Sequence, residues 1–425
     1  MDLKNDRVFY GWWIVAAVFL ISAYVSGIIT FGFTAVFEPI VSEFGWSYTQ
    51  VALAMSIRGL EVGLLAPLVG LLFDRWGPRK LIFWGAAVTG LGLLLFSRIH
   101  TLVAFYLAFF LIAAGNSCHI GIVPMTVTAN WFHRKVSIAT GIAVSGAAAG
   151  GLLVPIVTRI IDMFGWRAAM VVFGLGAWAI IFPLSLIVRH KPEPYGYLPD
   201  GDVSIDRVAN RDPTSASRTE SGMAVGQALK STTFWFISLG VVCHIFSIHA
   251  VLTHVMPYLS SLGIARSTSS ILASAIPLMS IIGRLGFGWF GDRYDKRRVI
   301  AASVLLAGLG MLCFGAVATA GTFFLVPFLI LFGIGYGGLA PVITGLLLEN
   351  FGRANLGSIL GILQGVAMLG SITGQPLAGW VFDTYGSYQG AWYAFFAVAI
   401  VGVVSLLNVP SISNKMKGIE LPMNH

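Results

Sequence analysis

The chain has 425 residues, of which 57% are hydrophobic and only 10% are charged. Soluble domains carry about 25% charged residues, so this composition excludes an ordinary water-soluble fold and indicates a membrane protein. Positively charged loops facing anionic lipid explain the net charge of +8, which does not indicate a nucleic-acid partner.

Apolar segments of about 20 residues or more follow one another along the chain, and each is long enough to cross the roughly 30 Å hydrocarbon core as a helix. Backbone groups in lipid must pair within their own segment. The sequence therefore predicts an all-α membrane protein with twelve transmembrane helices. The predicted spans are 11–37, 47–73, 80–97, 102–127, 136–161, 167–188, 232–259, 268–291, 299–319, 323–348, 355–382 and 388–409.

The Lys and Arg residues outside the spans lie in alternate loops. Only Arg98, Arg159, Arg167 and Arg266 fall on one side, and the others fall on the opposite side. The positive-inside rule places that second side, with both termini and the long middle loop, in the cytoplasm. The first span is too long for a signal-peptide core, so we expect it to be retained. We expect a multi-pass protein of the cell (inner or cytoplasmic) membrane, monomeric and, from its short tails, bacterial.

The chain divides at the polar, proline-rich loop from Arg189 to Lys230. GLLFDRWGPRK from Gly70 matches GWFGDRYDKRR from Gly288, and Pro155, Asp162 and Gly165 recur as Pro376, Asp383 and Gly386. We therefore predict two six-helix repeats, an N-terminal half over 1–188 and a C-terminal half over 231–425, joined by a cytoplasmic linker over 189–230.

The repeated motif and the two six-span halves resemble the major facilitator superfamily of secondary transporters over essentially the whole chain. Within it, Arg284 in the eighth span and the opening YGWWIV at Tyr10 resemble the monocarboxylate transporter and oxalate/formate exchanger branch. The resemblance implies alternating access, with Arg284 binding the carboxylate of the substrate. Ser280 stands where the animal carriers have an aspartate, and the first span has no lysine. The eleventh span offers Gln364 and Gln375 where a dicarboxylate exchanger would have a second cation.

Charge alone also draws attention to Arg284. A charged side chain near the bilayer centre costs about 2.5–3.5 kcal/mol on insertion scales, so it usually faces a cavity and has a partner. The only acidic residue deep within a span is Glu61, which has Arg58 one helical turn away. A small organic anion is one partner for Arg284, because a guanidinium presents a fork of donors that fits a carboxylate. A salt bridge to Glu61 across the halves and snorkelling toward the cytoplasm are the alternatives.

Other polar side chains at membrane depth are candidates for the same substrate site, each against a structural alternative. His249 could donate to a carboxylate or exchange a proton near neutral pH, whereas His244 and His254 are expected to be structural. GNSCHIG places Asn116 and His119 on one predicted helix face, and the hydroxyl of Tyr336 in GIGYGG could be a second donor. The predicted substrate-binding residues are Arg284, Asn116, His249, Tyr336, Gln364 and His119.

A second set of charged residues is predicted to control coupling and gating. Arg58 and Glu61 could form a self-neutralised pair, or a pair that opens between the outward and inward states with Glu61 as a proton site. Residues of the repeated motif could latch helices together or only fix loop geometry. The predicted coupling and gating residues are Arg58, Glu61, Asp74, Arg75, Asp292 and Arg293.

These patterns favour a secondary transporter of small monocarboxylates, lactate-like or pyruvate-like, that works by proton coupling or exchange. A drug or organic-anion efflux carrier of the same superfamily and a non-transporting nutrient sensor remain as alternatives. No HExxH, GxSxG or nucleotide-binding motif occurs, so neither an enzyme nor an ATP-driven pump is expected. Cys118, Cys243 and Cys313 lie in apolar segments without CxxC spacing, and no metal or cofactor is expected.

Overall fold

The computed structural model describes residues 9–46, 48–201 and 223–410, and within these ranges the chain forms helices and no strands. Ten helical stretches there are long and apolar enough to cross a membrane. One of them, Val136–Ile187, covers two predicted spans, and α3 (Tyr48–Trp76) lies on the predicted span 47–73. A helix therefore lies on every predicted span, and the predicted all-α membrane architecture is confirmed.

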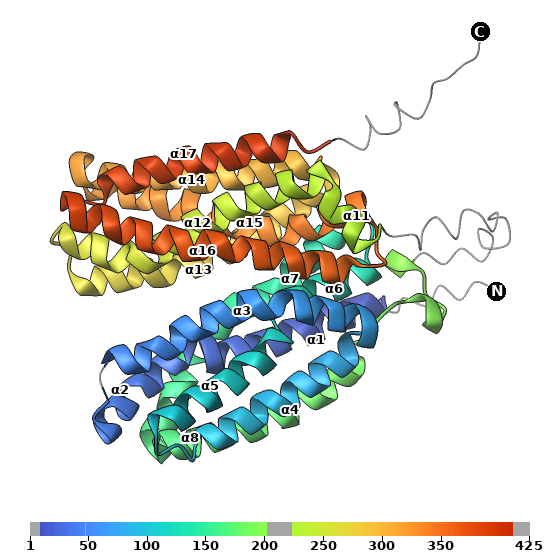
Figure 1. The fold of residues 1–425 in the computed structure, drawn as a ribbon, viewed down its shortest axis with the longest axis horizontal. Coiled ribbons are helices and arrows are strands. Elements are labelled where there is room, and N and C mark those ends of the chain that lie inside the picture. Colours follow the sequence, from blue (N-terminus) through green and yellow to red (C-terminus); the bar gives the residue numbers. More distant parts are fainter. Residues whose placement is uncertain (1–8, 47, 202–222, 411–425) are drawn as a thin grey trace, which may run out of the picture. The chain divides into compact units, whose positions relative to one another are not determined.

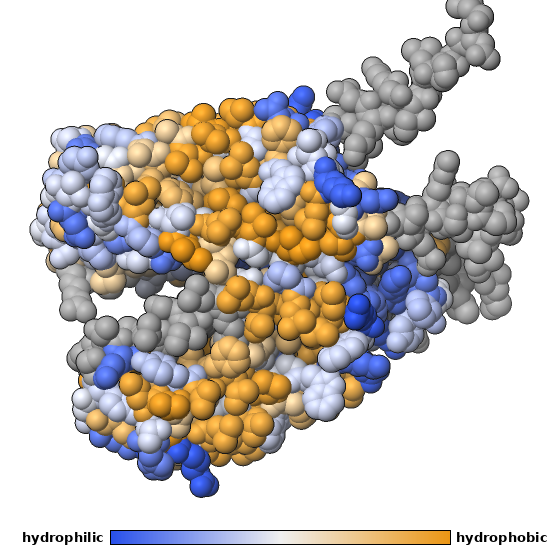
Figure 2. Space-filling view, viewed as in Figure 1, coloured by the Kyte–Doolittle hydropathy of each residue, from blue (hydrophilic) through white to orange (hydrophobic). Residues whose placement is uncertain are grey.

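Helix contacts divide the chain into two units, which we call the N-terminal and C-terminal units (Figure 1). The N-terminal unit comprises Met1–Ala216 with Leu360–Gly365, and the C-terminal unit comprises Ser217–Ile359 with Val366–His425. Figure 2 shows apolar side chains gathered over the middle of the helices and polar ones at the helix ends, as a helix surrounded by lipid requires.

Helices of the N-terminal unit follow the predicted spans, with several interruptions. A π-helical turn, η1 (Ser26–Phe31), joins α1 (Tyr10–Val25) to α2 (Phe33–Phe44). The remaining elements are α3 (Tyr48–Trp76), α4 (Pro78–Phe96), α5 (Leu102–Ser117), α6 (Ile122–Trp131), α7 (Val136–Ala149), η2 (Gly150–Leu153) and α8 (Val154–Ile187).

Two of these interruptions are fixed by glycines with positive φ. Gly165, at φ 76° and ψ 157°, breaks α8 between the predicted spans 136–161 and 167–188. The second break was not predicted, because we expected one continuous helix over 102–127. The chain instead leaves the helix after Ser117 and resumes at Ile122, following Gly121 at φ 75°. Glycine takes these values without the steric cost that other residues incur.

The C-terminal unit consists of long helices in the predicted order. Its elements are α11 (Val225–Lys230), α12 (Thr232–Ser261), α13 (Arg266–Arg293), α14 (Lys296–Ala320), η5 (Thr322–Phe324), α15 (Leu325–Phe351), α16 (Leu356–Tyr385) and α17 (Gln389–Leu407).

Both ends of the predicted linker 189–230 are attached to a unit, and its middle, 202–222, lies outside the described residues. The first part, with the short turns η3 (Glu193–Tyr195) and η4 (Pro199–Gly201), is held on the N-terminal unit. There Trp131 Nε1 donates to the Arg189 carbonyl at 3.0 Å, and Asp200 accepts from the backbone N–H groups of His133 and Arg134 at 2.9 Å.

The last part of this loop is attached to the C-terminal unit in the same manner. The Met223 N–H donates to the Phe351 carbonyl at 2.8 Å, and Asn355 Nδ2 donates to the Met223 carbonyl at 3.1 Å. Helix α11 then continues directly into α12. These bonds add residues from both ends of the predicted linker to the folded units.

Candidate functional site

Arg284 lies in the interior of α13, as the sequence predicts. Arg293 ends this helix, so at a rise of roughly 1.5 Å per residue Arg284 is about 14 Å from the end. Its side chain is half-buried, and the guanidinium carbon lies 5.9 Å from the ring centroid of Tyr336 on α15. This is the range of a cation–π contact, so the cation and the phenol form one cluster.

Glycines bring α13 and α15 close enough for that contact. A Cβ added at Gly337 would lie 2.1 Å from the Ser280 carbonyl oxygen and 2.8 Å from the Arg284 nitrogen. A Cβ at Gly283 would lie 2.0 Å from the Ile334 carbonyl oxygen. Only a hydrogen fits at these positions, so backbone touches backbone on both sides of Tyr336. The glycine-rich GIGYGG segment therefore sets where Tyr336 meets Arg284.

Ser280 lies one turn before Arg284 and is bonded within its own helix. The residue is fully buried, and its hydroxyl donates to the Pro277 carbonyl at 2.6 Å. This is a local side-chain-to-backbone bond to the carbonyl three residues earlier in the same helix. A serine in this position is occupied structurally and does not titrate near neutral pH.

His249 and His254 on α12 are both bonded to Gln375 on α16. The Gln375 amide nitrogen lies 3.4 Å from His249 Nδ1, and the Gln375 carbonyl oxygen lies 2.9 Å from His254 Nε2. His254 Nδ1 also lies 3.2 Å from the Tyr388 hydroxyl. Sequence reasoning did not place Gln375 in a site. Its position as one of two amides inside an apolar span, with Gln364, was the signal that could have marked it.

In the N-terminal unit, Asn116 and His119 do not share a helix face, because α5 ends between them at Ser117. The one-face prediction for this pair is therefore wrong. His119 is fixed by its neighbours: Nε2 lies 3.2 Å from the Ile82 carbonyl, and Ser22 Oγ donates to the His119 carbonyl at 3.3 Å.

Among the candidates in the N-terminal unit, Asn116 has a side-chain oxygen available for a further hydrogen bond. The residue is 3% exposed, and its Oδ1 is buried with no hydrogen-bond partner among the described residues. Such an atom normally has a partner, so this amide suits a protein, water or substrate donor. Gln364, the remaining predicted substrate residue, is half-buried on α16 within the stretch that clusters with the N-terminal unit.

The predicted gating residues lie at the ends of α3 and α13. Asp74 and Asp292 are half-buried, Arg75 is exposed, and the Arg293 guanidinium carbon lies 3.7 Å from the ring centroid of Trp289. The side chains of Arg58 and Glu61 lie outside the described residues, so their predicted pairing stays a prediction.

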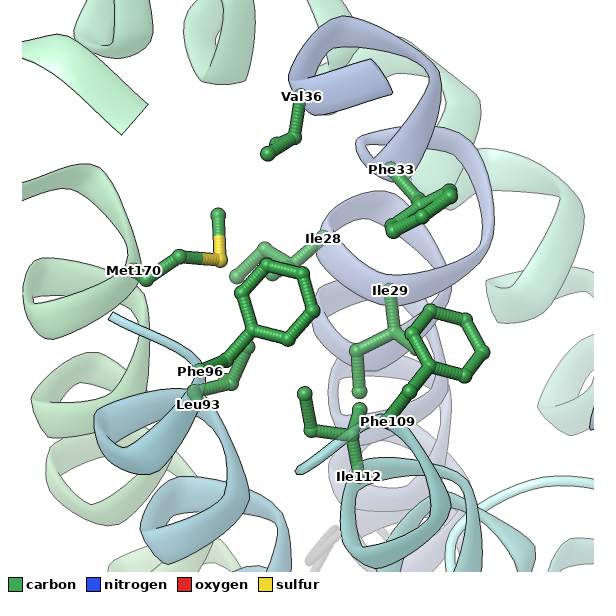
Figure 3. Close-up of a pocket in the computed structure, with 9 residues that line it drawn as sticks. All are labelled: Ile28, Ile29, Phe33, Val36, Leu93, Phe96, Phe109, Ile112 and Met170. Carbon is green, nitrogen blue, oxygen red and sulfur yellow. The ribbon is translucent and has the colours of Figure 1, made fainter. Parts of the chain in front are cut away.

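An apolar pocket in the N-terminal unit does not belong to this chemistry. Figure 3 shows side chains from η1 and α2 directed toward those of α4, α5 and α8 around it. The lining is entirely apolar and offers no donor to a carboxylate. Its residues are Ile28, Ile29, Phe33, Val36, Leu93, Phe96, Phe109, Ile112 and Met170. Across the ranges that the structure describes, no three His, Cys, Asp or Glu side chains could hold a metal ion.

Long apolar helices in two units, with a cation and polar groups placed inside them, define a multi-pass membrane protein. The family model of the Major Facilitator Superfamily matches residues 15–265 and 237–418. The chain therefore belongs to the major facilitator superfamily.

Known proteins agree with this assignment. The chain is 26% identical over 439 residues to monocarboxylate transporter 12 of Rattus norvegicus, covering 97% of this chain and 88% of that protein. It is 25% identical to monocarboxylate transporter 13 of Bos taurus, covering 94% and 89%. The predicted resemblance to this branch is thereby confirmed.

Among solved structures, the fold is similar to a proton:xylose symporter and to the fucose:proton symporter of E. coli. The first match has a TM-score of 0.76 at 14% identity and covers 94% of this chain and 96% of the other. The second has a TM-score of 0.68 at 16% identity and covers 94% and 99%. At these identities the structures show a shared fold, without showing a shared substrate.

Proposed function

We propose that this protein is a secondary transporter of small monocarboxylates, lactate-like or pyruvate-like, that works by alternating access in the cell membrane with both termini in the cytoplasm. The observation that carries the proposal is the guanidinium of Arg284, held inside α13 against the ring of Tyr336. The names of the relatives support the same substrate class.

In this mechanism the substrate carboxylate accepts two parallel N–H···O bonds from the Arg284 fork. Tyr336 contributes its ring to the guanidinium and its hydroxyl to the substrate. Asn116, with its available Oδ1, is the first candidate ligand from the N-terminal unit. We keep Gln364 and His119 as secondary candidates, the latter with its Nε2 already bonded to Ile82.

A bound monoanion adds a negative charge beside Arg284 at membrane depth, and we expect this attraction to favour the closed state over the open ones. We assign Asp74, Arg75, Asp292 and Arg293 to the gating of that closure, and Arg58 with Glu61 to coupling. The protein is proposed to act as a monomer.

Counterflow of labelled lactate in proteoliposomes tests the function, and Arg284→Lys tests the anchor. Lysine keeps the charge and loses the fork, so one charge-assisted bond of about 1.5–3 kcal/mol disappears. We expect the apparent affinity for lactate to fall by about tenfold or more. Arg298→Lys, on the exposed start of α14, is the matched control and should behave as wild type.

An Arg284→Lys protein with wild-type lactate affinity would contradict direct carboxylate binding. A wild-type protein that shifts its unfolding temperature with lactate but shows no counterflow would be a nutrient sensor. Counterflow with lipophilic compounds and none with lactate would favour the efflux alternative.

A further inference from the structure

Gln375 on α16 joins two histidines of α12 within the C-terminal unit. Its side-chain amide reaches His249 and its backbone carbonyl reaches His254, at 3.4 and 2.9 Å. Helices α12 and α16 run side by side in Figure 1, and both lie in the membrane-spanning region. Amides and imidazoles at this depth are costly unless they have partners or a function.

The hydrogen bonds of His254 allow only one tautomer of its neutral ring. A carbonyl oxygen can only accept, so Nε2 carries the hydrogen and donates to Gln375. Nδ1 is then the acceptor and receives the Tyr388 hydroxyl at 3.2 Å. His254 is therefore held from both sides and fixes the backbone of Gln375.

His249 is bonded to Gln375, whose side-chain amide can pair with either protonation state of the imidazole. Neutral His249 uses Nδ1 as an acceptor for the Gln375 NH₂ group, which is the arrangement seen here. Protonated His249 carries a hydrogen on Nδ1 and needs an acceptor there. The Gln375 amide supplies one by turning over, because its oxygen and nitrogen are nearly isosteric. The two amide orientations thus correspond to His249 with and without a proton.

Glycines keep the two helices in register beside this group. Cβ atoms added at Gly370 and Gly374 would each lie 2.4 Å from a carbonyl oxygen of α12, those of Val242 and Phe246. A Cβ at Gly379 would lie 3.5 Å from the His254 ring, which is an ordinary van der Waals contact, so this position would tolerate a small side chain. The close approach of α12 and α16 therefore holds the backbone on both sides of Gln375 in a fixed position relative to α12.

We propose that His249 is the proton-binding residue of this transporter, with Gln375 as the amide that turns over on protonation and His254 as the residue that positions Gln375. The inference rests on the proposed transport function and names its co-substrate. A proton from solution bonds to the Nδ1 lone pair and leaves from the same atom on the other side of the membrane. No other bond forms or breaks.

Titratable and charged groups on the elements around α12 define the setting of this site. Besides Cys243, His244, His254 and Tyr258 on α12 itself, the groups on the neighbouring elements are Arg266, Arg284, Asp292 and Arg293 on α13, Lys296, Arg297, Arg298 and Cys313 on α14, Tyr336 and Glu349 on α15, Asp383 and Tyr385 on α16, and Tyr388 and Tyr393 around α17. The acids among these described groups are Asp292, Glu349 and Asp383, and each lies in the last turn of its helix. Imidazole is the side chain whose unperturbed charge change falls between pH 5 and 8, and it is the residue type that α12 places beside the Gln375 amide.

The test compares two assays in proteoliposomes: lactate counterflow at equal pH, and net lactate accumulation driven by a pH gradient. For one proton per lactate, each unit of pH difference drives about tenfold accumulation. We expect wild type and the control His100→Gln, an exposed loop residue, to reach this value. His249→Gln should retain measurable counterflow while its accumulation falls to about onefold.

Gln375→Met provides an independent variant of similar size without the amide, and it should also weaken gradient-driven accumulation more than counterflow. Full gradient-driven accumulation in His249→Gln, or in Gln375→Met if His249→Gln does not fold, would overturn the proton site while leaving the carrier intact. Wild-type counterflow without any response to the gradient would do the same. Absence of counterflow in wild type would instead overturn the proposed function on which the inference rests.

Discussion

The ring of Tyr336 helps to hold the charged side chain of Arg284 away from water. The aromatic face attracts the cation, and the contact is strongest where water is excluded. The attraction arises from the ring quadrupole and uses no N–H···O hydrogen bond. The phenol therefore steadies the cation without competing for the donors that a carboxylate needs.

Tyr336 variants separate the ring from its hydroxyl. Tyr336→Phe keeps the ring contact and loses one hydrogen-bond donor, so we expect lactate affinity to fall by about two- to tenfold. Tyr336→Leu loses the ring as well, so we expect its lactate affinity to fall by about a further threefold. Initial rates of counterflow against lactate concentration measure both. If the Phe variant matches wild type while the Leu variant is impaired, the hydroxyl has no part in binding.

At the scale of elements, the contact between α13 and α15 depends on the absence of side chains. Gly283 and Gly337 face backbone atoms at distances no Cβ could occupy, whereas a Cβ at Gly286 on the same α13 would meet nothing within 4 Å. Without water to drive apolar association in lipid, close packing of this kind supplies much of the helix–helix attraction.

Gly337→Ala and Gly286→Ala form a matched pair. The first inserts a methyl group against the Ser280 carbonyl, and overpacking of this kind costs about 1–3 kcal/mol. The second gains helix propensity and should be neutral or stabilising by up to about 1 kcal/mol. Thermal unfolding in detergent should show a lowered midpoint for Gly337→Ala alone. Equal midpoints for the two variants would mean that α13 and α15 are not in backbone contact.

Glu43 at the end of α2 is paired with Arg167 on α8. Arg167 donates to one carboxylate oxygen and Trp166 Nε1 donates to the other at 2.7 Å. The hydrogen bond from Arg167 holds the pKa of Glu43 below its ordinary value. A carboxyl group with a lowered folded pKa stabilises the protein above its unfolded pKa of about 4.3, and that contribution is lost as pH falls through the folded pKa.

Glu43→Gln isolates this contribution, because the amide oxygen can still accept from Trp166. The pair is partly exposed, so we expect only about 0.2–1 kcal/mol between wild type and variant at neutral pH. Unfolding midpoints measured from pH 7 down to about pH 3 should converge as Glu43 becomes protonated. A difference that is the same at both ends of this range would mean that the charge of Glu43 does not contribute.

Across the whole molecule, the repeat detected in the sequence recurs in the backbone. Gly165 and Gly386, matched in the sequence repeat, both have positive φ, at 76° and 66°. Gly45 and Gly263 are separated along the chain by a nearly equal number of residues, and both also have positive φ, at 66° and 74°. Positive φ is a physical reason for glycine at these positions in both copies.

Span positions were predictable because length and hydropathy determine what crosses a bilayer, and Arg284 was predictable because its charge is expensive there. The break after Ser117 was not, since a polar GNSCHIG segment can also continue as a helix, and only the φ of Gly121 distinguishes the two. The role of Gln375 was not predictable either. Its bonds to His249 and His254 join residues more than a hundred positions apart, and no spacing along the chain encodes them.

The π-helical turn of the first span, Ser26–Phe31, accommodates one surplus residue in its winding. Each residue turns a helix by about 100°, so that single insertion rotates everything beyond it relative to α1. Glu43 lies beyond this turn, at the far end of α2, which is about twenty ångströms long. The direction in which Glu43 points toward Arg167 therefore depends on the π-helical turn at the other end of α2. Shortening Ser26–Phe31 by one residue would swing the carboxylate off its partner without altering either of the two side chains that meet.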